Sequence, residues 1–152
     1  MRELKNWDNK TWLSSFAYIN SFNTFLLKKK KINKNSQILD IGCGRGKIFG
    51  VLSRKIKLLN KPIGIDLLGH KDVDVGIDFR NEDAFKFFKS NQIKFDLIMI
   101  KQTLHFFNKH KRSKLIKVSK NNLKKNGVLI ILSLNTLNNE RTFKIYERKK
   151  SS

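Results

Sequence analysis

The stretch that decides the fold runs from Ile38 to Lys47 and reads ILDIGCGRGK. It opens with a short apolar run and closes with three glycines at alternate positions. From Lys47 to Leu59 the apolar residues then recur at helical spacing. Glycine allows positive φ and a close approach of backbone to ligand, and a helix start offers free N–H donors. The stretch therefore predicts a strand, a glycine loop and a helix that together suit ligand binding.

Spacing excludes two well-known glycine loops. A Walker loop needs a glycine five residues before its Gly-Lys pair and Ser or Thr after the lysine, but Ile41 and Ile48 stand there. The dinucleotide fingerprint needs a third glycine where this chain has Lys47. A tight strand-to-helix turn without a ligand is the alternative that the glycines alone leave open.

The same alternation of strands and helices continues along the chain. Strands are expected at 63–66, 75–79, 95–100 and 128–134, and helices at 12–27, 47–59, 84–90 and 112–123, with a turn at 124–127. Near-continuous Val, Ile and Leu runs between helices indicate a parallel sheet covered on both faces. We predict an α/β, doubly wound, mostly parallel Rossmann-like sheet of strand order 3-2-1-4-5, with helices on both faces and ligands at the carboxyl ends of the strands.

The length of 152 residues suits one domain. We expect a helical extension at 1–35, a ligand-binding core at 36–134 and a short tail at 135–152. No apolar stretch approaches the roughly 20 residues that cross a bilayer, so no membrane partner is expected. Cys43 is the single cysteine, which excludes an internal disulfide or a cysteine-based zinc site and fits a reducing compartment. We expect a soluble, cytoplasmic protein.

The formal net charge of +21 is compatible with binding to nucleic acid, because clustered lysines release counterions from phosphates. Lys28 to Lys31, followed by Lys34, form the densest basic cluster. Two causes unrelated to nucleic acid would also produce this charge. A-rich and T-rich codons would raise the content of Lys, Asn and Ile together, and lysines at a helix end suit the negative end of the helix dipole.

The segment from Asp40 to Gly46 resembles the Asp-x-Gly-x-Gly-x-Gly loop of class I S-adenosylmethionine-dependent methyltransferases at every fixed position. The resemblance implies S-adenosyl-L-methionine as cofactor. It places Asp40 near the amino group of the methionine portion, and Gly42 and Gly44 beside the methionyl and ribose portions.

Two further motifs carry the resemblance. Ile63 to Asp66 ends in an acid, which in this family accepts hydrogen bonds from both ribose hydroxyls. Asn81 to Ala84 resembles the family's Gly-Asp-Ala motif with Glu82 in place of glycine. Asp83 would contact the adenine amino group, cap the helix that begins at Ala84, or do both.

The fourth strand and the lead into the fifth also resemble the family. The segment 95–107 has the Leu-His ending that often follows strand four, and 123–129 resembles Leu-Lys-Pro-Gly-Gly without the proline and one glycine. The likeness covers about Ser36 to Ser133. The implied cofactor-binding residues are Asp40, Gly42, Cys43, Gly44, Gly46, Asp66, Leu67, Asp83, Ala84 and Lys101.

Methyl transfer from a sulfonium is a direct displacement, so a dedicated general base is optional. The catalytic residue is therefore unknown. His105 is the candidate that can take a proton near neutral pH, against a structural role on a helix turn. Trp7, Trp12 and Phe16 are expected either to form a lid across the cofactor cleft or to pack on the sheet.

Relatives usually continue after strand five with a helix and two antiparallel strands, but only residues 135–152 follow here. We expect those strands to be missing, a truncated helix at 142–149, and a strand-five edge open to pairing as a homodimer. A small-molecule methyl acceptor is favoured, because strand four lacks an Asn-Pro-Pro-aromatic or Asp-Pro-Pro-aromatic motif. The alternatives are an RNA methyltransferase and a non-catalytic cofactor-binding or partner-binding domain.

Overall fold

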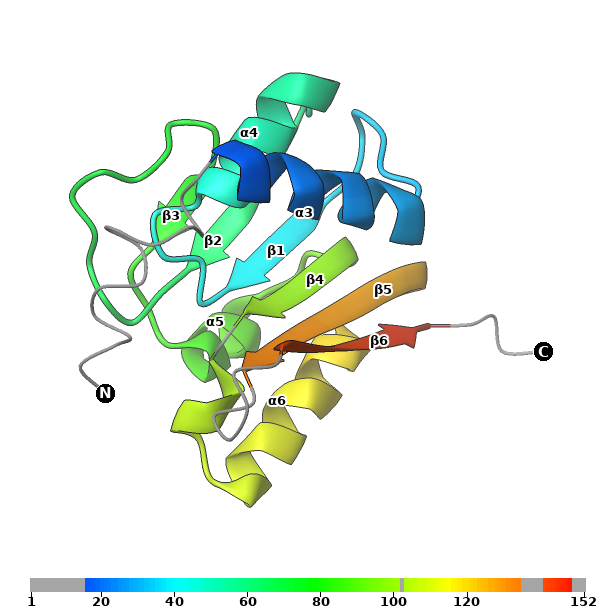
Figure 1. Cartoon of the computed structure of the whole chain (residues 1–152). Coiled ribbons are helices and arrows are strands. Elements are labelled where there is room, and N and C mark those ends of the chain that lie inside the picture. The colour runs from blue at the N-terminus through cyan, green and yellow to red at the C-terminus, as the bar shows by residue number, and fades with distance from the viewer. Residues whose placement is uncertain (1–15, 102, 135–140, 149–152) are drawn as a thin grey trace.

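The fold is described from a computed structural model for residues 16–101, 103–134 and 141–148. Within those residues, strands and helices alternate for most of the length (Figure 1). The elements are α3 Phe16–Lys29, β1 Ile38–Ile41, α4 Lys47–Ile56, β2 Ile63–Ile65, β3 Asp78–Arg80, α5 Ala84–Ser90, β4 Phe95–Lys101, the 3-10 helix η2 Leu104–Phe106, α6 Lys109–Asn121, β5 Leu123–Leu134 and β6 Arg141–Glu147.

The strands form one sheet in the order β3-β2-β1-β4-β5-β6. Neighbours pair in parallel from β3 through β5, and β6 pairs antiparallel with β5. The predicted doubly wound α/β class and the order 3-2-1-4-5 are confirmed. Because the strands are parallel, the carboxyl ends of β1, β2 and β4 meet at one edge of the sheet, toward the lower left in Figure 1.

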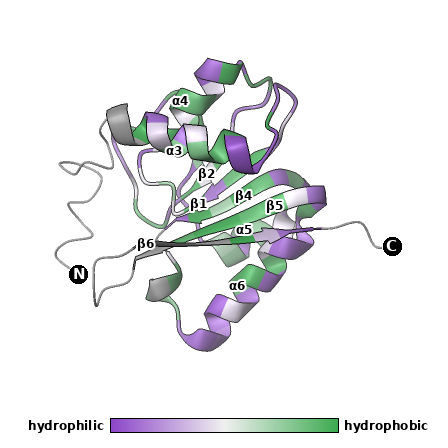
Figure 2. Ribbon diagram, turned by 45° about the vertical axis from the view of Figure 1, so that its right-hand side comes forward, coloured by the Kyte–Doolittle hydropathy of each residue, from purple (hydrophilic) through white to green (hydrophobic). Residues whose placement is uncertain are grey.

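Helices cover both faces of the sheet, as predicted. Successive residues of β4 alternate between two cores: Leu97 and Met99 pack with α3 and α4, whereas Ile98 and Ile100 pack with α5 and α6. This two-sided burial explains why the strand sequences lack an apolar and polar alternation. Figure 2 shows the central strands in hydrophobic green, between helices banded green and purple.

The C-terminal segment corrects the sequence prediction. Arg141–Glu147 is the strand β6, whose register with β5 runs from Leu134 opposite Arg141 to Val128 opposite Glu147. One antiparallel strand is therefore present where the sequence predicted none, the predicted truncated helix was wrong, and β5 is not the sheet edge. The segment is rich in Thr, Phe, Ile and Tyr, which favour strands, and Ile145 and Tyr146 pack against opposite cores.

Smaller differences concern element ends. The predicted turn at 124–127 lies inside β5, where Asn126 has φ 63° and the ladder with β4 shifts register. Strand β3 starts only at Asp78, because the preceding residues turn back on Asp74. Helix α6 begins earlier than predicted, at Lys109, because the side chain of Asn108 caps it. Among the described residues, no helix has the length and apolar character needed to cross a membrane.

Candidate functional site

The glycine loop lies at the carboxyl end of β1, the central strand of the parallel part of the sheet. Gly42, Gly44 and Gly46 have φ of 74°, 57° and 70°, so all three occupy the left-handed region. That conformation costs an L-residue about 1–2 kcal/mol. The positive φ that glycine permits is therefore found at all three positions. The glycines stand at alternate positions because the loop takes a left-handed backbone conformation at each of them.

Hydrogen bonds tie the loop to the end of β2. The amides of Gly42 and Cys43 donate to the carbonyl of Ile65 at 2.8 and 3.1 Å. The amide of Gly44 donates to Oδ2 of Asp66 at 2.8 Å. The fold therefore brings Asp66 against the glycine loop, although 22 positions separate Gly44 from Asp66 in sequence.

The carboxylate of Asp66 is held in place by backbone groups. Its Oδ1 accepts from the amide of Leu68 at 2.9 Å, and Nε2 of His70 lies 3.6 Å from Oδ2. The side chain is 16% exposed. Each carboxylate oxygen has about two acceptor sites, so Asp66 keeps capacity for ligand hydroxyls in a fixed orientation.

Asp40 places a second carboxylate under the start of the loop. It lies in β1 between Gly64 of β2 and Met99 of β4, and the residue is 2% exposed. A buried carboxylate is costly unless positive charge or hydrogen-bond donors compensate it.

Gly42 has no side chain, and neighbouring residues of the chain occupy the space that a side chain would need. A Cβ there would collide with Oγ1 of Thr103 and lie 2.8 Å from the carbonyl oxygen of Lys101. At Gly46 a Cβ would collide with Ile77. Two of the loop glycines thus let the loop pack against the segment after β4 and the residues before β3. No sequence pattern indicated Thr103, because its contact forms only in the folded chain.

Lys101 closes the other side of the loop, since its Nζ donates to the carbonyl of Cys43 at 3.4 Å. Cys43 itself is buried. Leu67 follows Asp66 and is 63% exposed at the same edge. Asn81 was not predicted to matter, yet its Nδ2 donates to the carbonyls of both Asp66 and Leu67 at 2.9 Å.

Asp83 is the N-cap of α5, with Oδ1 accepting from the amide of Lys86 at 3.1 Å, and Ala84 is buried behind it. The predicted capping role is confirmed, and contact with adenine stays a prediction. His105 lies in η2, but its side chain is outside the described residues. The side chain of Phe16 and the whole of 1–15, which includes both tryptophans, also lie outside them, so the lid is untested.

A second device, not predicted from the sequence, fixes the loop between β2 and β3. Arg54 of α4 donates to Oδ1 and Oδ2 of Asp74 at 2.6 and 3.0 Å, and the amide of Asp74 donates to the carbonyl of Arg45 at 2.8 Å. The hydrogen bonds from Arg54 hold the pKa of Asp74 below its ordinary value, against the opposing effect of burial. Asp74 thus joins this loop to α4 and to the glycine loop.

The described residues contain no group of three His, Cys, Asp or Glu side chains placed to hold a metal ion. The site therefore consists of carboxylates, backbone amides and one lysine. A family profile described as a methyltransferase domain matches residues 39–131. The chain belongs to this methyltransferase-domain family. The match lies within the predicted core at 36–134 and confirms the resemblance to class I S-adenosylmethionine-dependent methyltransferases.

Solved structures of methyltransferases are similar to this methyltransferase domain. The plantazolicin methyltransferase BpumL in complex with SAH has 26% sequence identity and a TM-score of 0.67, over 88% of this chain and 52% of that chain. A SAM-dependent methyltransferase from Archaeoglobus fulgidus has 22% identity and a TM-score of 0.60, over 78% and 54% of the two chains.

Coclaurine N-methyltransferase, bound to N-methylheliamine and SAH, has 12% identity and a TM-score of 0.60, over 76% of this chain and 36% of that chain. At the identities of the last two structures, the likeness concerns the fold alone. The chain spans about half the length of BpumL. A sequence search of curated proteins found no match.

Proposed function

We propose that this domain binds S-adenosylmethionine at the carboxyl edge of its sheet and transfers the methyl group to a small-molecule acceptor. The observation that carries the proposal is the glycine loop, with three left-handed glycines between β1 and α4 and a direct hydrogen bond from Gly44 to Asp66. The presence of SAH in the BpumL structure supports the choice of cofactor.

The residues around the loop fit the polar groups of that cofactor. Asp66 suits the two ribose hydroxyls, because both of its oxygens are fixed and retain acceptor capacity. Asp40 suits the positive charge of the methionine portion. Leu67 and Asp83 would line the adenine end, and Lys101 would close the cleft against the loop. The carboxylates oppose the overall charge of +21, so they supply local negative charge where a cation binds.

The cofactor supplies a methyl group on a positive sulfur, which leaves as a neutral thioether when an acceptor lone pair bonds to the methyl carbon. The chain's residues therefore need only hold both molecules in line and keep water out. A small-molecule acceptor agrees with the segment after β4, which lacks the proline motif of many nucleic-acid and protein amino methylases. The presence of β6 weakens the non-catalytic alternative, which was suggested by missing C-terminal strands.

Calorimetric titration with SAH tests cofactor binding. Wild type is expected to bind, and Asp66→Ala to bind at least about tenfold more weakly, because two hydrogen bonds of about 1 kcal/mol each are lost. Asp72→Ala is the matched control, since Asp72 is an exposed acid of the same loop. Failure of the wild type to bind, or equal losses in both variants, would contradict the proposal.

The acceptor class needs a separate measurement. Transfer of a labelled methyl group from S-adenosylmethionine is followed into cell extract that is divided into metabolite, RNA and protein fractions. We expect label among the metabolites, and its loss with Asp66→Ala. Label in the RNA fraction would establish the alternative acceptor, and binding of SAH without any transfer would establish a non-catalytic domain.

A further inference from the structure

Positive side chains gather at the edge of the sheet opposite the proposed cofactor site. The amino ends of the parallel strands and the carboxyl ends of α3, α4 and α6 meet there, on the right in Figure 1. Five segments form this edge: 28–34, 57–61, 94, 120–125 and 148. Every charged residue in them is Lys or Arg. We call them together the amino-edge surface.

Contacts show that these segments form one continuous surface. The amide of Leu59 donates to the carbonyl of Lys34 at 2.8 Å, and Nζ of Lys30 donates to the carbonyl of Asn126 at 2.7 Å. Lys94 and Arg148 donate to the neighbouring carbonyls of Asn121 and Leu123 at 2.7 and 2.6 Å. Basic side chains from distant parts of the sequence are therefore held side by side.

Three acids lie near this edge: Asp96 and Asp78 are paired with basic side chains, and Glu147 is exposed beside Arg148. Asp96 lies 3.0 Å from Nζ of Lys124, and Asp78 lies 3.1 Å from Arg80. By contrast, the cofactor edge carries Asp40, Asp66, Asp72, Asp74, Glu82 and Asp83 among its basic residues and is mixed in charge. Codon bias would add lysines without regard to position, whereas this edge carries three acids, fewer than the cofactor edge does. The helix dipole accounts for lysines in last turns but not for Lys34, Lys61 or Lys125.

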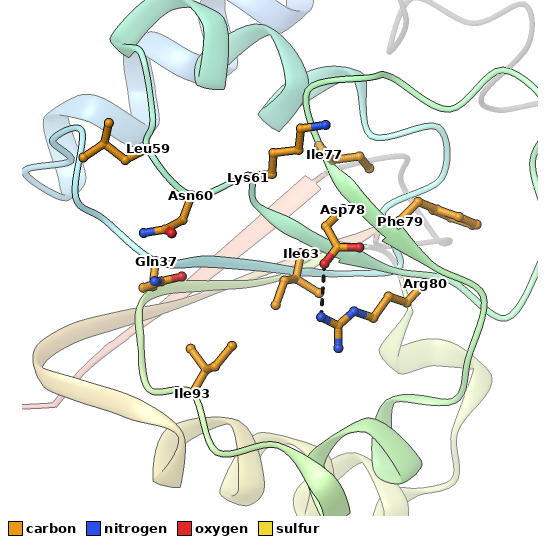
Figure 3. Close-up of a pocket in the computed structure, with 10 residues that line it drawn as sticks. All are labelled: Gln37, Leu59, Asn60, Lys61, Ile63, Ile77, Asp78, Phe79, Arg80 and Ile93. Atoms are coloured by element: carbon orange, nitrogen blue, oxygen red, sulfur yellow. Dashed lines mark hydrogen bonds and ion pairs between the residues drawn. The ribbon is translucent and has the colours of Figure 1, made fainter.

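A groove of about 580 Å³ opens beside segment 57–61 of the amino-edge surface, and it is also lined by β3, which carries the ion pair of Asp78 and Arg80 (Figure 3). Amide groups of Gln37 and Asn60 line it together with the exposed aliphatic side chains of Leu59 and Ile93, and Lys61 stands at its margin. Amides can hydrogen-bond to the edge of a nucleobase while an aliphatic side chain contacts its face. Lys61 at this groove, together with the lysines of the neighbouring segments, suits the phosphates between bases. A flat anionic membrane would make no use of the groove.

We propose that the amino-edge surface binds single-stranded nucleic acid by its phosphates and is a docking surface, separate from the methyl-transfer site. Strand β4 has seven residues, so about 20 Å of strand separates the two edges. Reacting atoms must approach to about 3.5 Å. Nucleotides held at the amino-edge surface are therefore not the methyl acceptor, and the inference holds whether or not the proposed acceptor class is correct.

The test compares two variants that each lose four exposed lysines. One carries Lys31→Gln, Lys34→Gln, Lys61→Gln and Lys125→Gln in the amino-edge surface. The matched control carries Lys71→Gln, Lys86→Gln, Lys109→Gln and Lys111→Gln elsewhere. Binding of a fluorescent single-stranded RNA is followed by anisotropy at several salt concentrations, and circular dichroism verifies that both variants fold.

The wild type is expected to bind with a strong salt dependence. The amino-edge variant should bind at least about tenfold more weakly at 0.1 M salt, with a log–log salt slope reduced by up to about 3, because each lost phosphate contact contributes about 0.7. The control should change less than about threefold. Equal losses in both variants would reveal attraction by net charge alone and overturn the proposal. So would absence of RNA binding at low salt, or a selective loss of binding to phosphatidylserine vesicles only.

Discussion

Single residues at the cofactor edge hydrogen-bond to two loops at once and so hold them together. Asp66 accepts from the glycine loop through Gly44 and from its own loop through Leu68, while His70 lies beside the same carboxylate. Asn81, two strands away from the glycine loop, holds the carbonyl of Asp66. The proposed ribose site is thus held by contacts among three segments, and its shape depends on backbone conformation more than on side-chain flexibility.

Replacing Gly42 with alanine tests that backbone requirement. The residue has φ 74°, and a Cβ would meet Thr103 and the carbonyl oxygen of Lys101 at 2.8 Å. We expect Gly42→Ala to lower the free energy of unfolding by about 2 kcal/mol or more in urea titrations, because left-handed strain and collision add. Gly69→Ala is the control, since the nearest atom to its Cβ lies at 3.6 Å and its φ is not in the left-handed region. Equal changes in the two variants would show that the loop relaxes freely.

The sequence allowed some of these residues to be predicted and not others. The glycines and Asp66 follow local rules, because each stands at the end of a recognisable apolar strand in a known motif. Thr103 and Asn81 were missed, since each acts on a partner from another strand and neither belongs to a periodic pattern. Asp74 was missed for the same reason, because its partner Arg54 lies on a helix 20 positions earlier.

At the scale of elements, the Arg54–Asp74 pair fastens the loop between β2 and β3 to α4. The side chain of Asp74 is 6% exposed and that of Arg54 is 53% exposed. We expect Asp74→Asn to lower the free energy of unfolding by about 2 kcal/mol at neutral pH, because a hydrogen-bonded charge pair is broken at one buried end. Asp78→Asn is the control, because its pair with Arg80 is about half exposed at both ends and contributes little.

The sign of the pH dependence follows from the lowered pKa of Asp74. The folded state holds this carboxylate ionised more strongly than the unfolded state does. The pair therefore stabilises the fold above the ordinary pKa of 3.8, and that contribution is lost as the pH falls through the lower folded value. Urea titrations between pH 7 and pH 2 should show the wild type converging on Asp74→Asn in acid. A constant difference between them would contradict the assignment.

Elements were predictable where several local signals agreed. Helix α5 runs over Ala84–Ser90, as predicted, because the cap Asp83 precedes a short apolar and basic pattern. Strand β6 was missed because its seven residues, RTFKIYE, do not alternate strictly between polar and apolar types and no glycine turn marks it as part of a hairpin. The strand forms because it pairs with β5, whose edge would otherwise be unpaired, and a local sequence pattern does not reveal that pairing.

For the whole molecule, β6 decides how the sheet ends. At the opposite side the sheet ends in β3, which has three residues and carries exposed Asp78 and Arg80. Short, charged edge strands resist pairing with other chains. On the β6 side, strand β5 has twelve residues with a strongly apolar centre. Without β6, it would be an exposed edge strand that could pair with other chains.

A variant chain that ends at Leu134 lacks β6. We expect it to elute as dimers or larger species in size-exclusion chromatography and to unfold at a lower temperature, because the backbone groups of β5 lose their partners and Ile145 and Tyr146 no longer pack on the two cores. A chain that ends at Arg148 is the control, since it keeps all of β6, and it should match the full chain. If the shorter chain instead stays monomeric with an unchanged unfolding temperature, β6 does not pair with β5 in solution.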